Sequence, residues 1–176
     1  MIMRPGHQLL LPANRLFIWG SLLAALGFDM LQNMGWWGRA AWMPDYLALA
    51  LVFWSVHQPQ RVGIGIAFVC GLFIDVHQGA MLGQHALAYT VLSFLAIAIH
   101  RRLLWFSVPS QAFQVFPLFA ASHAIALSVR MMAGDAFPGF SILLAPVIES
   151  LLWPVVSVIL LLPQRRTPNP DVHRPL

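Results

Sequence analysis

Long apolar stretches separated by short polar segments run through most of the chain. A helix that crosses a bilayer needs about 20 mostly apolar residues, with a range of roughly 17 to 25. Six stretches meet or approach that length, and the second and third are short. They lie at residues 16–33, 44–57, 62–76, 80–99, 111–132 and 140–162. The pattern predicts an all-α integral membrane protein, a bundle of about six transmembrane helices.

The segments between these stretches define the expected organisation. Residues 58–60 and 77–79 are loops of only a few residues, so the second, third and fourth helices are expected to be antiparallel neighbours. Residues 35–43 are rich in Trp and broken by Gly, and we expect them to lie along the outer membrane surface. Residues 1–163 are predicted to form a single six-helix domain. Residues 164–176, with prolines among polar residues, are predicted to be a disordered cytoplasmic tail.

Composition supports a location in the lipid bilayer. The chain is 59% hydrophobic and 9% charged, whereas soluble domains carry about 25% charged residues. All basic residues are Arg and the net charge is +4, but the arginines are scattered between apolar runs. This spacing indicates topology signals rather than a nucleic-acid-binding patch. Cys70 is the only cysteine, so an intramolecular disulfide or a Cys-based metal site is excluded.

The arginines also predict the orientation, because loops rich in Arg and Lys stay in the cytoplasm. If both termini are cytoplasmic, only Arg39 and Arg130 lie outside. The remaining eight lie inside: Arg4, Arg15, Arg61, Arg101, Arg102, Arg165, Arg166 and Arg174. No cleavage site of small residues follows a short apolar core near the N-terminus, so the first helix is expected to remain in the protein. The sequence therefore predicts a multi-pass protein with both ends in the cytoplasm.

The stretch from Arg61 to residue 87 contains small residues at intervals of four. Small residues at this spacing allow a neighbouring membrane helix to approach closely. The third and fourth helices are therefore expected to pack tightly around the turn that follows Asp75. The candidate packing or partner-binding motif consists of Arg61, Gly63, Ala67, Gly71, Asp75, Gly79 and Gly83.

Asp75 lies where lipid or packed protein is expected, and a charge at a helix centre costs about 2.5 to 3.5 kcal/mol on insertion scales. Two interpretations remain open. In the first, the carboxylate caps the loop or pairs with another polar side chain across the turn. The candidates for this pairing are His77, Gln84 and His85. In the second, Asp75 contacts a partner, a proton or a substrate.

Glu149 is the second candidate for a buried acid, because it lies in an apolar helix between Pro146 and Pro154. It is expected either to stabilise a proline kink by a hydrogen bond or to have a function. Asp29 and Asp45 are interpreted as structural. Asp45 stands at the start of a helix, where a carboxylate meets the positive end of the helix dipole.

His85 and His123 are expected to be hydrogen-bonded interior residues, because no paired metal-ligand spacing such as H-E-x-x-H is present. Ser122 and His123 are adjacent on a helix and point about 100° apart, and no G-x-S-x-G motif occurs. An intramembrane protease is therefore not favoured. The sequence predicts no enzyme, no cofactor and no metal.

Several short motifs occur in a fixed order: M-P-D-Y at residues 43–46, Pro59 with Arg61 and Val62, G-L-F-I-D at 71–75, G-x-x-x-G at 79–83 and L-W-P at 152–154. In this order and spacing the chain resembles the MreD family of rod shape-determining proteins. The resemblance implies a non-enzymatic inner-membrane component of the bacterial cell-wall elongation machinery. Such a component would maintain rod shape by binding and positioning MreC and the peptidoglycan synthases of the RodA and penicillin-binding-protein types.

The resemblance also implies a bundle similar to the substrate-binding subunits of energy-coupling-factor transporters, and Asp75 with its flanking glycines matches the family's most recognisable motif. Gln84 and His85 depart from the family pattern. Two classes of function remain. One is a scaffold that binds a single-pass partner helix through a groove of small residues. The other is a small-molecule, vitamin-type substrate-binding subunit of a membrane transporter, with a cavity beneath the outer loops lined by Asp75, His85 and Glu149.

Overall fold

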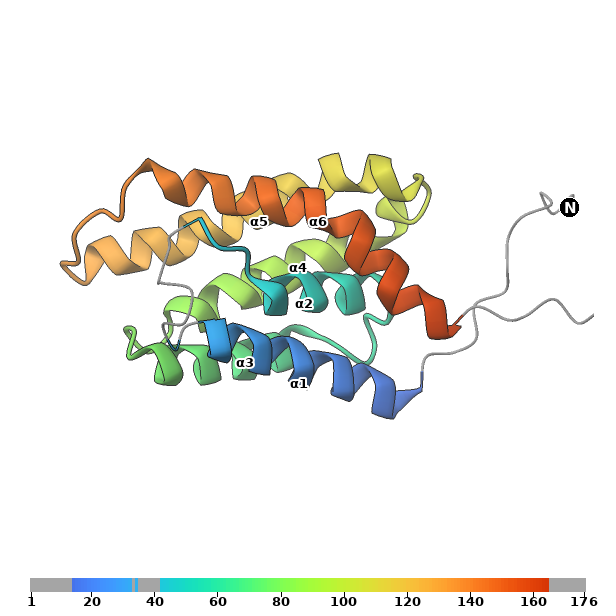
Figure 1. Ribbon diagram of the computed structural model, residues 1–176, viewed down its shortest axis with the longest axis horizontal. Coiled ribbons are helices and arrows are strands. Elements are labelled where there is room, and N and C mark those ends of the chain that lie inside the picture. Colours follow the sequence, from blue (N-terminus) through green and yellow to red (C-terminus); the bar gives the residue numbers. More distant parts are fainter. Residues whose placement is uncertain (1–13, 33, 35–41, 165–176) are drawn as a thin grey trace, which may run out of the picture.

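The computed structural model describes residues 14–32, 34 and 42–164, and six α-helices lie within them. The helices run along the long axis of the molecule, and successive helices alternate in direction (Figure 1). They are α1 (Arg15–Leu31), α2 (Tyr46–His57), α3 (Ile64–Gln78), α4 (Gln84–Leu103), α5 (Val108–Met132) and α6 (Leu144–Leu161). Short 3-10 helices, η2 (Phe140–Leu143) and η3 (Leu162–Gln164), flank α6. The predicted all-helical architecture with six helices is confirmed.

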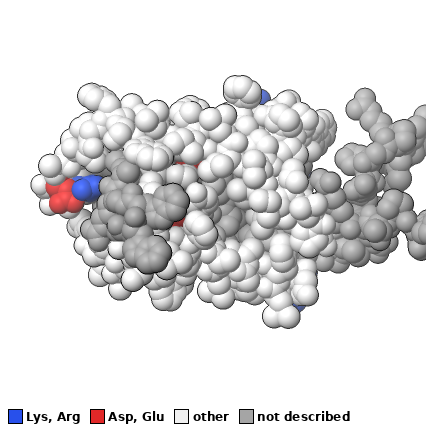
Figure 2. Space-filling model, viewed as in Figure 1, with Lys and Arg blue, Asp and Glu red and all other residues white. Residues whose placement is uncertain are grey.

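Three helical stretches are long and apolar enough to cross a membrane: Gln84–Leu103, Val108–Met132 and Phe140–Gln164. Tyr46–His57 and Ile64–Gln78 are shorter apolar helices. The outside of the bundle carries many exposed large apolar side chains, such as Phe73, Phe113 and Leu151. In Figure 2 nearly all described atoms of this face belong to uncharged residues. Such a surface suits contact with lipid.

Because the helices alternate in direction, the starts of α2, α4 and α6 lie at the same end as the last turns of α1, α3 and α5 (Figure 1). We call this end the acidic end, because Asp29, Asp45, Asp75 and Glu149 all lie near it. The opposite end, which we call the arginine end, carries Arg15, Arg61, Arg101 and Arg102.

Helix α2 is enclosed by the rest of the bundle. Every residue from Leu47 to Val56 is buried, and α2 packs against α1, α4 and α6. Its 12 residues span roughly 18 Å at about 1.5 Å per residue, which is less than the roughly 30 Å hydrocarbon core. Trp54 donates its indole N–H to Ser21 of α1, and Ser55 bonds Ser93 of α4. The start of α2 therefore lies within the bundle, where Leu47 is fully buried and Asp45 and Tyr46 are partly exposed.

The close approach expected between the third and fourth helices is present at Gly71. A Cβ atom added to Gly71 would lie 2.4 Å from the Cα of Ala86 on α4, so any larger residue would collide with backbone. Ala67, one turn earlier on α3, is also fully buried. Small residues let helices pack at this distance in the absence of a hydrophobic driving force.

The turn after Asp75 differs from the prediction. Helix α3 continues through His77 to Gln78, and α4 begins only at Gln84. Gly79 and Gly83 have φ of +63° and +104°, a left-handed conformation that glycine adopts without the steric cost of a Cβ. The fourth helix was expected from residue 80, so the expected boundary was wrong: Gly79 ends α3 and Gly83 directly precedes α4.

The outer-surface segment predicted at residues 35–43 falls mostly outside the described residues, and so do Trp36 and Trp37. The same holds for the tail from residue 165 onward. Gln164, assigned to that tail, belongs instead to η3 and donates its side-chain amide to the carbonyl of Leu160. The extent of the single domain and the disorder of the tail stay predictions.

Candidate functional site

The start of α4 is held by one carboxylate, that of Asp75. Its Oδ2 accepts from the backbone N–H groups of Gly83 at 2.9 Å and Ala86 at 3.3 Å. Its Oδ1 accepts from the backbone N–H of His85 and lies 2.8 Å from Nδ1 of the same histidine. The first N–H groups of a helix lack intrahelical acceptors, and here the buried carboxylate of Asp75 accepts their hydrogen bonds.

These contacts agree with the first interpretation of Asp75, in which the carboxylate pairs with a polar side chain across the turn. The carboxylate pairs with His85 and caps α4. His77, another candidate for this pairing, instead places its Nε2 3.1 Å from the carbonyl oxygen of Met30. Gln84 contributes no hydrogen bond to Asp75.

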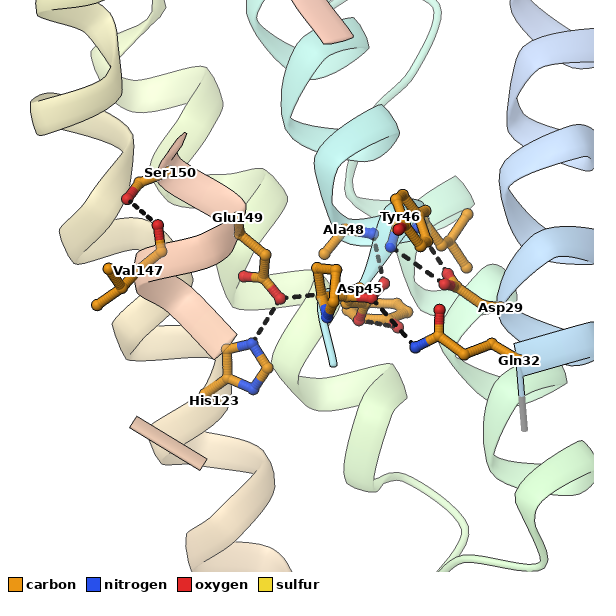
Figure 3. A network of polar contacts seen from close by, with 12 residues as sticks. Asp29, Gln32, Asp45, Tyr46, Ala48, His123, Val147, Glu149 and Ser150 are labelled. Carbon is orange, nitrogen blue, oxygen red and sulfur yellow. Dashed lines mark hydrogen bonds and ion pairs between the residues drawn. The ribbon is translucent and has the colours of Figure 1, made fainter. Parts of the chain in front are cut away.

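The start of α2 is held by three carboxylates (Figure 3). Asp45, the residue before the helix, accepts from the N–H of Ala48 at 2.7 Å, as its position in the sequence predicts. Asp29 of α1 accepts from the N–H groups of Tyr46 and Leu47 at 3.1 and 2.7 Å. Glu149 of α6 accepts from the N–H of Asp45 at 3.0 Å. All four backbone donors at this helix start have a carboxylate acceptor.

Two further side chains extend this cluster. His123 of α5 places Nε2 2.8 Å from Oε1 of Glu149, and the Tyr89 hydroxyl donates to Oδ2 of Asp45. The second oxygen of Glu149, Oε2, is buried and has no hydrogen-bond partner among the described residues. The interpretation of Glu149 as a kink-stabilising residue was wrong, because its side chain points across the bundle to α2 and α5 (Figure 3).

A cavity of about 750 Å³ lies between the two helix starts. Its wall includes His85, Gln84 and Tyr89 from α4, His123 and Arg130 from α5, and Asp29 and Asp45 beside α2. The sequence predicted a cavity lined by Asp75, His85 and Glu149, and only His85 of these three lines it. Asp75 and Glu149 lie behind the wall because they are directed at backbone N–H groups.

The two histidines occupy equivalent positions in this arrangement. Each has one ring nitrogen on a fully buried carboxylate, while 16% of the His85 side chain and 24% of the His123 side chain is exposed. Both are hydrogen-bonded interior residues, as the sequence predicts. When a neutral imidazole donates its one N–H to a carboxylate, its other nitrogen becomes an acceptor. Among the described residues, no group of three or more His, Cys, Asp or Glu could hold a metal ion.

The remaining motif residues lie apart from this cavity. Arg61 lies at the arginine end, where it lines a small cavity of about 210 Å³ together with Arg15 and Trp19. Gly63 precedes the first turn of α3. Ala67 and Gly71 lie at the contact between α3 and α4 described above.

Sequence reasoning missed the cluster around the start of α2. Of the three acids, only Asp45 was identified as a helix-start residue, because it directly precedes the predicted helix. Asp29 bonds residues 17 and 18 positions away, and Glu149 bonds a residue 104 positions away. Contacts between residues so far apart in the sequence leave no local pattern from which they could be predicted.

The chain matches the family model described as rod shape-determining protein MreD over residues 13–163. The chain belongs to the MreD family. It is similar to the rod shape-determining protein MreD of Haemophilus influenzae, with 27% identity over 139 residues, which cover 77% of this chain and 76% of that protein. No solved structure matches the chain. The resemblance seen in the sequence is thus confirmed, and MreD membership with three long apolar helices identifies a multi-pass inner-membrane protein that determines rod shape.

Proposed function

We propose that this MreD protein is a non-enzymatic scaffold of the cell-wall elongation machinery. In this role it binds and positions an MreC-type single-pass protein and wall synthases of the RodA and penicillin-binding-protein types. The family match over residues 13–163 carries the proposal. The use of the four acids at the acidic end supports it, because Asp29, Asp75 and Glu149, which are buried, and Asp45, which is partly exposed, all accept hydrogen bonds from backbone N–H groups at helix starts. Carboxylates engaged in this way have a structural task.

The proposal includes an orientation with both termini in the cytoplasm and six membrane-spanning helices. Four described arginines lie at the arginine end, and Arg130 lies at the other. Because positively charged ends stay inside, the arginine end would face the cytoplasm and the cavity would open to the outside. The similarity to the substrate-binding subunits of energy-coupling-factor transporters stays a prediction.

The position of Gly71 changes how a partner helix would bind. Ala86 of α4 already occupies the small-residue contact at Gly71, so a partner cannot enter there without displacing α4. The motif would then act by holding α3 in place. The outer side of α3, which exposes Phe68 and Phe73, would remain available to a partner helix.

Complementation with affinity purification tests the scaffold. The tagged chain is expressed in a rod-shaped bacterium that lacks its own MreD protein, and cell shape and co-eluting proteins are determined. We expect rods, together with a single-pass MreC-type protein and a wall synthase in the eluate. Spherical cells despite normal membrane levels of the chain would contradict the proposal.

Photo-crosslinking in the same cells locates the partner. A crosslinking residue at Phe73 on α3 is expected to capture the single-pass protein, whereas one at Leu151 on the exposed side of α6 serves as the matched control. Capture only from Leu151 would place the partner on α6 instead.

A substrate-binding subunit of a membrane transporter is the second candidate, and the cavity of about 750 Å³ favours it. Pockets of roughly 300 to 1,000 Å³ are usual for small ligands. Such a subunit would co-elute with ATP-hydrolysing transporter components rather than with wall synthases, so the purification described above separates the two candidates.

A further inference from the structure

The cavity at the acidic end extends from loops into the interior of the bundle. Gly79 and Ala80 of the α3–α4 turn and Pro138 before η2 contribute to its wall. Asp45 and Tyr89 lie deeper, beside the buried start of α2. In Figure 2 red areas of acidic residues show at the acidic end and, in small patches, among the white and grey atoms of this face. A polar wall thus reaches a depth at which the surrounding side chains are apolar.

Gln84 is the unexplained residue of this wall. It lines the cavity and is only 9% exposed. Its side-chain amide is not among the fully enclosed polar atoms, so it opens to the cavity, and no hydrogen bond joins it to another described residue. Buried amides almost always have partners, because losing hydration without a replacement costs free energy. A ligand in the cavity would supply the missing partner.

The two histidines add acceptors to the same wall. His85 and His123 each have one ring nitrogen fixed on a buried carboxylate, at 2.8 Å in both cases. In their neutral forms, the second nitrogen of each ring accepts a hydrogen bond. When both rings are neutral, the wall offers acceptors from α4 and from α5 to a ligand that carries donors.

The charges around the cavity favour a cation. Asp45 contributes a negative charge to the wall, Asp29 lines the cavity as a carboxyl group held on two N–H groups of α2, and Asp135 is paired with Arg130. Arg130 is the only arginine among the described lining residues, and its Nε lies 3.2 Å from Asp135. The helix starts of α2 and α4 carry partial positive charge, but their N–H groups point at carboxylates rather than into the cavity.

We propose that this cavity binds a small organic cation whose N–H groups donate to the wall formed by Gln84, His85 and His123. An organic ammonium ion fits because it combines positive charge with several donors. The inference goes beyond the scaffold role, which requires no small ligand, and it would give the second candidate function its ligand class.

The test uses the full chain in lipid nanodiscs with 1,4-diaminobutane as the probe. Binding is measured by isothermal titration and by the rise in Tm, since a ligand that binds only the folded state stabilises it. We expect 1,4-diaminobutane to bind, and succinate, 1,4-butanediol and tetramethylammonium to bind at least about tenfold more weakly, a difference of about 1.4 kcal/mol. No binding of the diamine, or stronger binding of succinate or of Zn²⁺ alone, would overturn the proposal.

Substitutions of different charge at Gln84 test whether this position contacts a positively charged ligand. The backbone N–H of Gln84 bonds the carbonyl of Met81, and no hydrogen bond of the fold depends on its side chain, so Gln84→Glu, Gln84→Leu and Gln84→Lys should all fold. The affinity for 1,4-diaminobutane is expected to fall in that order, with several-fold steps. The reverse order would contradict the proposal, and equal affinities would place the binding elsewhere.

Gln114→Leu is the matched control, because Gln114 lies on α5 outside the cavity lining, and its affinity should equal that of the unchanged protein. Rod-shape complementation separates the two proposals. If Gln84→Lys restores rods but the unchanged protein binds no diamine, only the ligand inference fails.

Discussion

The backbone N–H groups at the starts of α2 and α4 are both bonded by carboxylates, but the two helices obtain these acceptors from different parts of the chain. Both helices begin inside the protein, where backbone N–H groups without partners are costly. At α4 a single carboxylate, Asp75, accepts from three backbone N–H groups that follow it by 8 to 11 residues. At α2 three carboxylates share four N–H groups, and one of these contacts joins residues 104 positions apart.

This difference indicates which part of the fold the carboxylates at each helix start stabilise. Asp75 and its donors belong to one helical hairpin, so the cap of α4 can form as soon as α3 and α4 meet. The cap of α2 requires α1 and α6 to be in place beside it. Loss of Asp75 should therefore damage one hairpin severely, whereas loss of one acid at α2 should leave part of a shared cap intact.

Gly71→Leu is expected to have the largest effect, because it breaks the contact that brings Asp75 to α4. An added Cβ would meet backbone atoms of Ala86 at 2.4 Å, and backbone cannot yield as a flexible side chain can. We expect loss of folded protein, measured as the monodisperse peak in size-exclusion chromatography of detergent extracts.

Gly20→Leu is the matched control for this change, since a Cβ at Gly20 on α1 meets nothing within 4 Å. It should give a peak close to that of the unchanged protein. A normal peak for Gly71→Leu would show that α3 and α4 can separate without loss of the fold.

Asp75→Ala is expected to have the next largest effect. It leaves three backbone N–H groups and the His85 ring without their acceptor. Removing one partner from a buried charged contact typically costs about 3 to 5 kcal/mol. Thermal unfolding in nanodiscs would measure the loss.

The control is Asp135→Ala, because Asp135 forms an exposed pair with Arg130 and such pairs contribute about 0 to 1 kcal/mol. If the two alanine variants unfold at the same temperature, Asp75 is not the anchor of α4.

Asp29→Ala and Glu149→Ala are each expected to cost less than Asp75→Ala. Asp29 serves two N–H groups of α2 and Glu149 serves one, so each variant leaves the other acids in place. An unsatisfied buried donor costs about 1 to 3 kcal/mol. The same thermal assay would rank Asp29→Ala as the more damaging of the two.

The double variant of Asp29 and Glu149 tests whether the cap is shared. Residues of one network are usually non-additive by about 0.5 to 3 kcal/mol, and we expect such coupling here. Strict additivity would indicate that the acids act independently, and a single α2 variant as damaging as Asp75→Ala would remove the contrast between the two helix starts.

His85→Ala is expected to have the smallest effect, about 0.5 to 1.5 kcal/mol, the usual net contribution of one hydrogen bond. Asp75 keeps three backbone donors without it. His123→Ala should cost more in the same assay, because Glu149 then retains only the N–H of Asp45. Equal losses would show that water in the cavity replaces both rings.

The sequence pattern was sufficient to predict the six helices and their order, because long apolar runs separated by short polar segments are a strong signal. It also named His85 among the three candidate partners of Asp75, since both flank one short turn. Gly83 was expected inside the fourth helix, because a four-residue spacing of glycines arises both on a helix face and across a turn with left-handed φ. The partner of Glu149 was unpredictable from local pattern, because the start of α2 lies far away along the chain.

The burial of α2 has a consequence for how freely its sequence can change. The outward residues of α3 and α6 are exposed, and in a bilayer they could exchange one apolar residue for another of different size, since lipid chains adapt to shape. Residues Leu47 to Val56 are enclosed on every side, so each must match the volume of fixed neighbours. Mutational tolerance should therefore be lowest in α2, although its composition resembles that of a lipid-exposed helix.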